Sequence, residues 1–306
     1  MNLMLTTSNL VGRKVLFLVV LILSLNLPLL LPYGFRLIEQ IILYSLLTLI
    51  WAILYKFLGL FFLGISGIVG LSIYLVSILH QLQIFVTPMD LFAASVLIGL
   101  ILAPLTYLVL RTSGGYFALL TLGLNLVFPL ITSSLDSSYF RVSARYLYFD
   151  IEFYAHFILL ALFFILSFLW LYLHMPVKLK NTLILIKRGK EIAESLGINF
   201  FIYRYFIVLL LLIIMAVLGV IHSTYLFRVD TLTIFPAELT LIPLTAGLLI
   251  VIKTRGDALI DIIISLLVPL LYLLFGIGVP ALVEVLLGLL IFGALAFMFK
   301  KMLVSK

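Results

Sequence analysis

The feature that most constrains this chain is a series of apolar runs, each about 20 residues long, that recur along its whole length. A helix of that length and composition can cross a hydrocarbon layer of about 30 Å. Only 10% of the 306 residues are charged, whereas a soluble domain averages about 25%. The sequence therefore predicts an all-α, polytopic transmembrane helical bundle that forms a single domain over residues 1–306.

Ten of these runs have the length and composition of membrane spans. They cover residues 15–31, 37–55, 57–79, 91–110, 116–132, 153–174, 205–226, 238–252, 258–275 and 280–299. Arg13 and Lys14 precede the first run, as they would precede the apolar part of a signal peptide, but the run is long for that role. No small-residue cleavage site follows it, so we expect an uncleaved first span.

The positions of the basic residues predict how these ten spans are oriented. If the spans alternate in direction, fifteen of the nineteen Lys and Arg residues fall on one side of the membrane and four on the other. Basic residues concentrate in cytosolic loops, so the richer side, which holds both termini, is predicted to be cytosolic. The same rule accounts for the net charge of +7, which therefore does not indicate nucleic-acid binding.

One long segment between the predicted spans, residues 175–204, is polar and carries six of the nineteen basic residues. Three apolar residues in its middle share one face of a predicted amphipathic helix: Leu185, Ile192 and Leu196. Gly197 is expected to end this helix with a positive φ, and Gly189 is expected to bend or fray one turn. The segment is either a solvated helix between two spans or a docking helix for a cytosolic partner.

The third predicted span carries Gly64, Gly67 and Gly70 at three-residue spacing. Small residues at such intervals let neighbouring helices approach closely, or let a broken helix bend beside a cavity. We expect this face of the span to pack tightly in the bundle.

Residues that could carry out chemistry are scarce. The chain contains no cysteine, no phosphate-binding Gly-Lys-Ser/Thr loop, no G-x-S-x-G and no H-E-x-x-H, so we predict no ATPase, cofactor or metal site. His222 lies inside the seventh predicted span and is either a functional group or a neutral histidine bonded to a neighbouring helix. Asp257 and Asp261 lie one turn apart, where they form either a two-carboxylate site or an acidic helix start.

Three stretches of sequence occur in the order of a known family pattern. The first is residues 63–70, which read LGISGIVG, followed by Tyr74. The second is Arg111-x-x-Gly114-x-Tyr116-Phe117-Ala118-x-x-Thr121-Leu122. The third is residues 191–199, which read EIAESLGIN and fit the spacing E-A-A-x-x-x-G with Ile192 in place of one alanine. Together they resemble the permease subunits of ATP-binding cassette (ABC) importers for branched-chain amino acids.

The resemblance implies a multi-pass permease of the plasma membrane that transports branched-chain amino acids or a related small polar solute. Its implied partners are separate ATPase subunits that use the ATP, a second permease subunit and an extracellular solute-binding protein. The implied ATPase contact lies in the coupling loop 175–204, at Glu191, Ala193, Glu194, Leu196 and Gly197. The implied helix-packing or pathway residues are Gly64, Gly67, Gly70, Gly114, Tyr116 and Thr121.

The chain departs from the family pattern at four places. Residues 133–136, Ser-Ser-Leu-Asp, and residues 245–249, Thr-Ala-Gly-Leu-Leu, stand where the family has Gly-rich stretches. Ile65 stands where the family has histidine, and residues 125–128, Asn-Leu-Val-Phe, replace a run of acidic and arginine residues. An alternative of another class is an intramembrane lipid-linked transferase, which would use Asp257 and Asp261 at the cytosolic face.

Overall fold

The computed structural model describes residues 34–82, 88–112, 115–147, 152–174, 178–252 and 258–276. These residues are almost entirely helical, which confirms the prediction of a helical fold for the described part of the chain. The first and tenth predicted spans lie outside the described residues, as do both termini.

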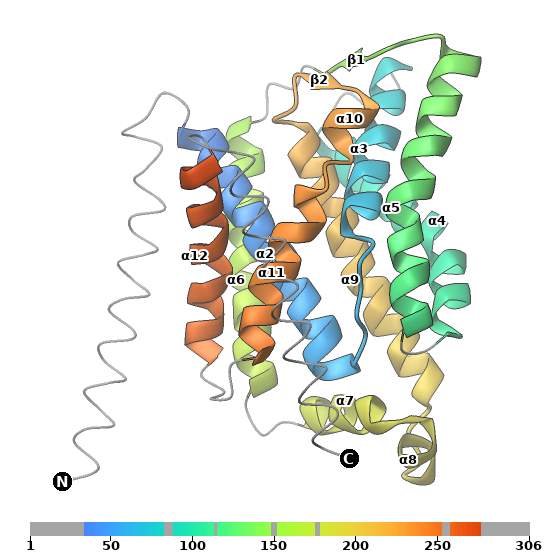
Figure 1. Cartoon of the computed structure of the whole chain (residues 1–306), viewed down its shortest axis with the longest axis vertical. Coiled ribbons are helices and arrows are strands. Elements are labelled where there is room, and N and C mark those ends of the chain that lie inside the picture. Colours follow the sequence, from blue (N-terminus) through green and yellow to red (C-terminus); the bar gives the residue numbers. More distant parts are fainter. Residues whose placement is uncertain are drawn as a thin grey trace, which may run out of the picture.

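Eight longer helices run along the described bundle, and shorter elements lie at its two ends (Figure 1). The longer helices are α2 (Gly34–Leu58), α3 (Ile65–Gln81), α4 (Pro88–Leu110), α5 (Gly115–Leu135), α6 (Glu152–His174), α9 (Phe200–Ser223), α11 (Glu238–Ile252) and α12 (Ala258–Gly276). One end, the α7–α8 end, carries α7 (Lys178–Arg188) and α8 (Lys190–Ser195). The other, the β1–β2 end, carries the π-helix η1 (Asp136–Phe140), β1 (Arg145–Tyr146), β2 (Arg228–Val229) and α10 (Thr231–Ile234).

Three helical stretches of the described chain are long and apolar enough to cross a membrane: Arg36–Leu58, Gly115–Phe140 and Phe200–Ser223. Shorter apolar helices cover Ile65–Gln81, Ile158–His174, Glu238–Ile252 and Ala258–Leu273. The described helices therefore have membrane-spanning character, while the count of ten crossings stays a prediction.

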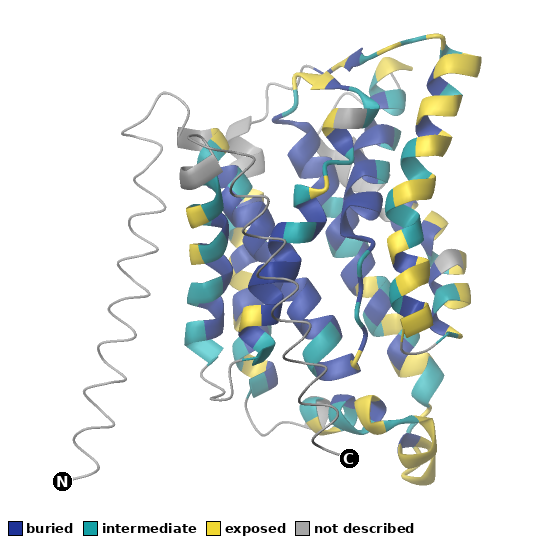
Figure 2. Ribbon diagram, viewed as in Figure 1, coloured by how far each residue is buried: buried dark blue, intermediate teal, exposed yellow. Residues whose placement is uncertain are grey.

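Helix α2 forms the centre of the bundle and α5 lies at its edge (Figure 2). In α2, 89% of an apolar 18-residue window is buried among the described residues, whereas only 11% of the corresponding window in α5 is buried. A helix that is apolar on all sides is stable where it is covered on all sides, and α2 packs against α6, α11 and α12. Helix α9 packs against α3 and α4 on the other side of the bundle. The described residues thus leave a wide apolar face of α5 uncovered.

The structure corrects the third predicted span, which is not one continuous helix over 57–79. Helix α2 continues to Leu58 and α3 begins only at Ile65, with residues 59–64 outside any helix. Gly59 causes the break, because it adopts a φ of +70° and its N–H donates to Tyr55 O at 3.1 Å, a common helix ending that favours glycine. The chain then runs back into the bundle, so α3 begins well inside it (Figure 1).

At the β1–β2 end, a short antiparallel pair joins the segment after α5 to the segment after α9. Arg145 pairs with Val229 and Tyr146 with Arg228. Helix α5 continues without interruption into η1, so the fifth predicted span, 116–132, is extended by about two turns. Residues 133–140, which follow the fifth predicted span, are therefore helical.

Candidate functional site

The break between α2 and α3 places irregular backbone inside an apolar bundle. Leu60 and Phe62 are buried, so the peptide groups around them need protein partners in place of water. Trp51 Nε1 donates to Phe62 O at 2.8 Å, and Leu63 N donates to Thr121 Oγ1 at 3.1 Å. Helix α5 therefore holds the extended segment through a side chain that is 58 residues away in the sequence.

The first turn of α3 also obtains its hydrogen-bond partners from other helices. Asn125 of α5 accepts from Gly67 N at 2.8 Å and donates to Leu63 O at 2.6 Å. Thr240 of α11 accepts from Ser66 N at 3.0 Å and from Asn125 Nδ2 at 3.2 Å. The first N–H groups of a helix have no partner within that helix, so Asn125 and Thr240 complete a helix end that water would satisfy at a surface.

Glycines bring α3 into close contact with the elements around it. A Cβ atom at Gly64 would lie 2.7 Å from Thr121 O, and one at Gly67 would lie 3.0 Å from Asn125 Oδ1. A Cβ atom at Gly70 would overlap the ring of Phe235. All three positions therefore face protein rather than open space. Two other residues named from the resemblance differ: Tyr116 is 76% exposed, and Gly114 lies outside the described residues.

The predicted amphipathic helix in residues 175–204 is two helices. Gly189 separates α7 from α8 with a φ of +136°, so the face expected to be continuous is divided and the chain changes direction there. Lys190 and Glu194, one turn apart in α8, form an ion pair at 4.0 Å. Lys187 turns away from α8 and donates to Lys56 O at the end of α2, at 3.0 Å. Gly197 ends α8 with a φ of +75°, as its position predicts.

The five residues expected at an ATPase contact fall into two groups. Glu191, Glu194, Leu196 and Gly197 are exposed, and Leu196 is 61% exposed. Ala193 is completely buried within the chain. Its O accepts from Ile198 N at 3.0 Å, so in this structure Ala193 packs within the chain while the other four residues face outward.

A buried ionisable pair joins α2 and α9. His222 Nδ1 lies 2.7 Å from Glu39 Oε1, and the Glu39 side chain is 1% exposed. The histidine that the sequence singled out is thus bonded to a side chain of a neighbouring helix. Glu39 could not be found from spacing, because it lies 183 residues away.

Asp261 lies in a second buried group, with Lys56 of α2 and His174 of α6. Lys56 Nζ lies 3.4 Å from Asp261 Oδ2 and 2.7 Å from His174 Nε2. The Asp261 side chain is 2% exposed, so its carboxylate is engaged by these two side chains inside the chain. Asp257, its expected partner in a transferase, lies outside the described residues. Among the residues that the structure describes, no three His, Asp or Glu side chains gather to hold a metal ion.

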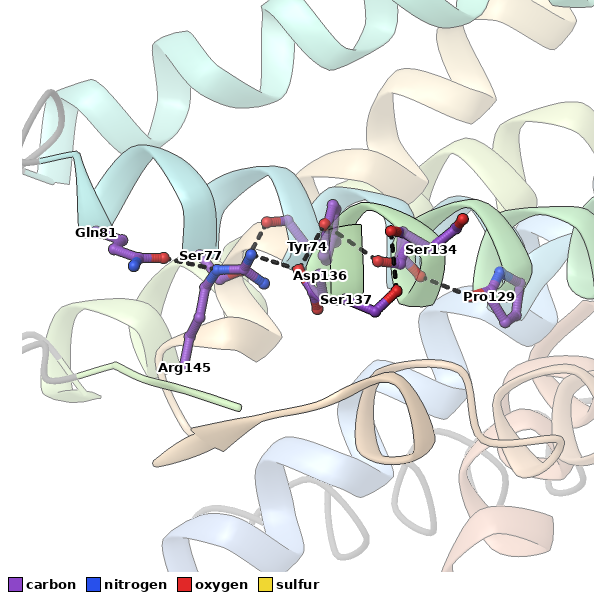
Figure 3. Close-up of polar contacts among 9 residues, drawn as sticks. Tyr74, Ser77, Gln81, Pro129, Ser134, Asp136, Ser137 and Arg145 are labelled. Carbon is purple, nitrogen blue, oxygen red and sulfur yellow. Dashed lines mark hydrogen bonds and ion pairs between the residues drawn. The ribbon is translucent and has the colours of Figure 1, made fainter. Parts of the chain in front are cut away.

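A third polar cluster holds the chain at the β1–β2 end (Figure 3). Arg145 Nη2 donates to Asp136 Oδ1 at 2.5 Å, and its Nε donates to Gln81 Oε1 at 2.8 Å. Tyr74 OH also donates to Asp136 Oδ1, at 2.8 Å. Arg145 is 4% exposed, so this cluster ties β1 to α3 and η1 from the inside. Local sequence spacing does not reveal this role, because Gln81 lies 64 residues from Arg145.

The structure thus presents three features for a functional interpretation: irregular backbone held by side chains within the bundle, an exposed pair of helices at one end, and a fixed loop at the other. Comparison of the chain with protein-family models, with curated proteins and with solved structures gives no match.

Proposed function

We propose that the chain is the membrane-spanning permease subunit of an ABC importer, for branched-chain amino acids or a related small polar solute. The observation that carries this proposal is the break between α2 and α3. Irregular backbone at membrane depth is tolerated where protein surrounds it or where it lines a pathway. Secondary transporters, which are a different class from ABC importers, use broken helices in this way, so the break supports a transport role in general and the resemblance supplies the ABC class. The resemblance of residues 63–70 falls on the same break.

In this proposal the chain crosses the plasma membrane about ten times, with both termini and the α7–α8 end in the cytosol. The fixed loop at the β1–β2 end then faces outward, where a solute-binding protein would dock. The exposed face of α5 is available to a second permease subunit, since so little of it is covered within this chain. ATP is bound by the partner ATPase subunits, and the permease itself needs no cofactor.

Coupling to the ATPase is assigned to the exposed side of α8. Ile192 is 43% exposed and Leu196 is 61% exposed, so two apolar side chains of a short helix are free to enter a groove. Glu191 and Glu194 flank them. Gly189 lies between α7 and α8, and Gly197 lies between α8 and α9. Both have positive φ, so the chain bends at each end of α8 and α8 forms a separate short helix.

The test is purification of the chain from its native membrane in mild detergent, followed by assays of bound ATPase and of ATP-driven leucine uptake after reconstitution. Leu196→Arg should abolish both activities, because the substitution adds charge and bulk at the proposed contact. Asn181→Arg is the matched control, since Asn181 is an exposed residue of α7. Wild-type protein that carries no ATPase and drives no uptake would disprove the permease proposal. A Leu196→Arg variant with normal ATPase content would disprove only the role of α8.

The orientation is tested in a chain that lacks cysteine. Ser138 of η1 and Ser195 of α8 are both exposed, and single Ser138→Cys and Ser195→Cys variants should react with a membrane-impermeant maleimide from opposite sides of intact cells. Labelling of both from outside would contradict the cytosolic placement of α8.

A further inference from the structure

The α7–α8 end contains an open cavity of about 720 Å³. Its walls come from the ends of α2 and α4, from α7 and α8, and from the first turns of α9. Four basic residues and one acidic residue line it, so its lining carries an excess of positive charge. The basic residues are Arg111, Lys187, Lys190 and Arg204, and the acidic one is Glu194.

The single acidic residue does not neutralise these cations. Glu194 lies 4.0 Å from Lys190, and both side chains are largely exposed. Arg111 instead donates to Tyr107 OH at 2.6 Å and lies over that ring. In the part of the chain that the structure covers, no carboxylate forms an ion pair with Arg111, Lys187 or Arg204.

Arg204 is a buried cation in the wall of this cavity. It is 8% exposed, and among the described residues no acceptor reaches its buried Nε. Its guanidinium carbon lies 5.3 Å from the centre of the Phe200 ring, which supplies a face but no acceptor. A buried N–H donor without a hydrogen-bond partner is costly, and an anion in the cavity would place acceptors beside this guanidinium.

The pKa of Lys187 in α7 also reflects the positive charge around this cavity. Desolvation of the ammonium, together with repulsion from Lys56, lowers the pKa of Lys187 from its ordinary value. Desolvation is the larger cause of this shift, and the repulsion from Lys56 is the part that a neighbouring anion would offset. A bound anion would relieve that repulsion and raise the pKa again.

We propose that this cavity binds a phosphate group, with Arg204 and Arg111 as its principal donors and Lys187 as a further cation. Guanidinium groups suit phosphate because they offer several N–H donors in a planar fork. Apolar and aromatic side chains complete the wall on the side of the bundle: Leu58, Tyr107, Leu110, Phe200 and Phe201. Such a wall suits a ligand that carries both a charged and an apolar part.

Two kinds of compound carry a phosphate group that fits this cavity. The first is the head group of an anionic phospholipid, since the cavity lies where apolar helices end and basic pockets at that level bind such head groups. The second is a soluble phosphate compound. The assignment does not rest on the transport proposal, and its test needs neither an ATPase nor a transported solute.

The experiment uses the purified full chain in a neutral detergent. Native mass spectrometry and thermal unfolding are measured with phosphatidylglycerol, with phosphatidylcholine and with inorganic phosphate. We expect phosphatidylglycerol or phosphate to bind and to raise the unfolding midpoint, and phosphatidylcholine to have a weaker effect. Arg204→Gln should weaken binding about tenfold or more, because it removes a charge-assisted hydrogen bond.

Arg111→Gln serves as a second variant, because Arg111 is exposed and its replacement should not disturb folding. Arg188→Gln is the matched control, since it removes the same charge from α7 without lining the cavity. Binding of phosphatidylglycerol alone supports the site with a lipid ligand, and binding of inorganic phosphate supports it with a soluble one. The proposal is overturned if neither binds, or if Arg111→Gln weakens binding no more than Arg188→Gln does.

Discussion

Asn125 is the residue whose replacement tests the structure most directly. Its amide satisfies Gly67 N and Leu63 O, one on each side of the point where α3 begins. Asn125→Leu keeps a side chain of similar size but leaves both backbone groups without these partners. Because neither group has ready access to water inside an apolar bundle, we expect the variant to lose stability by leaving them unsatisfied rather than by creating a cavity.

The magnitude follows from the two lost partners. A buried polar group left without a hydrogen bond costs about 1–3 kcal/mol, so the loss at Gly67 N and Leu63 O together is on the order of 2–6 kcal/mol. A loss of that size is a large fraction of the total stability of about 5–15 kcal/mol that folded proteins have. Asn125 also donates to Thr240 Oγ1, so Thr240→Val should couple with Asn125→Leu in a double-mutant cycle.

The assay is equilibrium unfolding of the purified chain in mixed micelles, followed by tryptophan fluorescence. Both tryptophans, Trp51 and Trp170, are completely buried, so unfolding exposes them. Asn181→Leu makes the same substitution at an exposed position of α7 and should leave the free energy of unfolding unchanged within about 0.5 kcal/mol. If Asn125→Leu also stays within about 0.5 kcal/mol of the wild type, these hydrogen bonds do not hold the α2–α3 break.

Three further predictions concern other contacts of the bundle. Gly64→Ala should destabilise the chain by about 1–3 kcal/mol, because its Cβ would lie 2.7 Å from a carbonyl oxygen of α5. Gly123→Ala is the control: its added Cβ would meet no atom within 4 Å, so it should be neutral or stabilising in the same unfolding assay. His222→Leu leaves the buried Glu39 carboxylate without its partner and should cost about 3–5 kcal/mol; a stability equal to that of the wild type would show that the pair contributes nothing. Arg145→Met removes the cation that ties β1 to α3 and η1, so limited proteolysis should cut residues 141–147 faster than in the wild type, and an unchanged rate would contradict a structural role for this cluster.

The sequence predicted three of the helices almost to the residue, whereas α9 begins five residues before and ends three residues before the expected span 205–226. The expected spans 153–174, 238–252 and 258–275 agree with α6, α11 and α12 to within a residue at each end. Local rules suffice there, because a run of apolar residues in a medium without water must satisfy its peptide groups within its own helix. Gly197 ends α8 with a positive φ for a similarly local reason.

Contacts between distant residues decided the candidate site. The run 57–79 has the hydropathy of a span, and nothing in its own composition separates a continuous helix from a helix that is interrupted at residues 59–64. The interruption is stable because Thr121, Asn125 and Thr240 supply hydrogen bonds across 58 to 174 positions of sequence. Asn125 was visible in the sequence only as a departure from a family pattern.

The distinction between local pattern and distant contacts also applies to α8. An amphipathic pattern places Ala193, Ile192 and Leu196 on a helix, but only the packing of α8 determines that Ala193 is buried while the other two are exposed. The sequence by itself therefore determined that the described chain is helical and apolar, because backbone hydrogen bonding and hydropathy act over a few residues. The tertiary structure alone decided where a helix could break and which charges meet, because those outcomes depend on partners that lie far away along the chain.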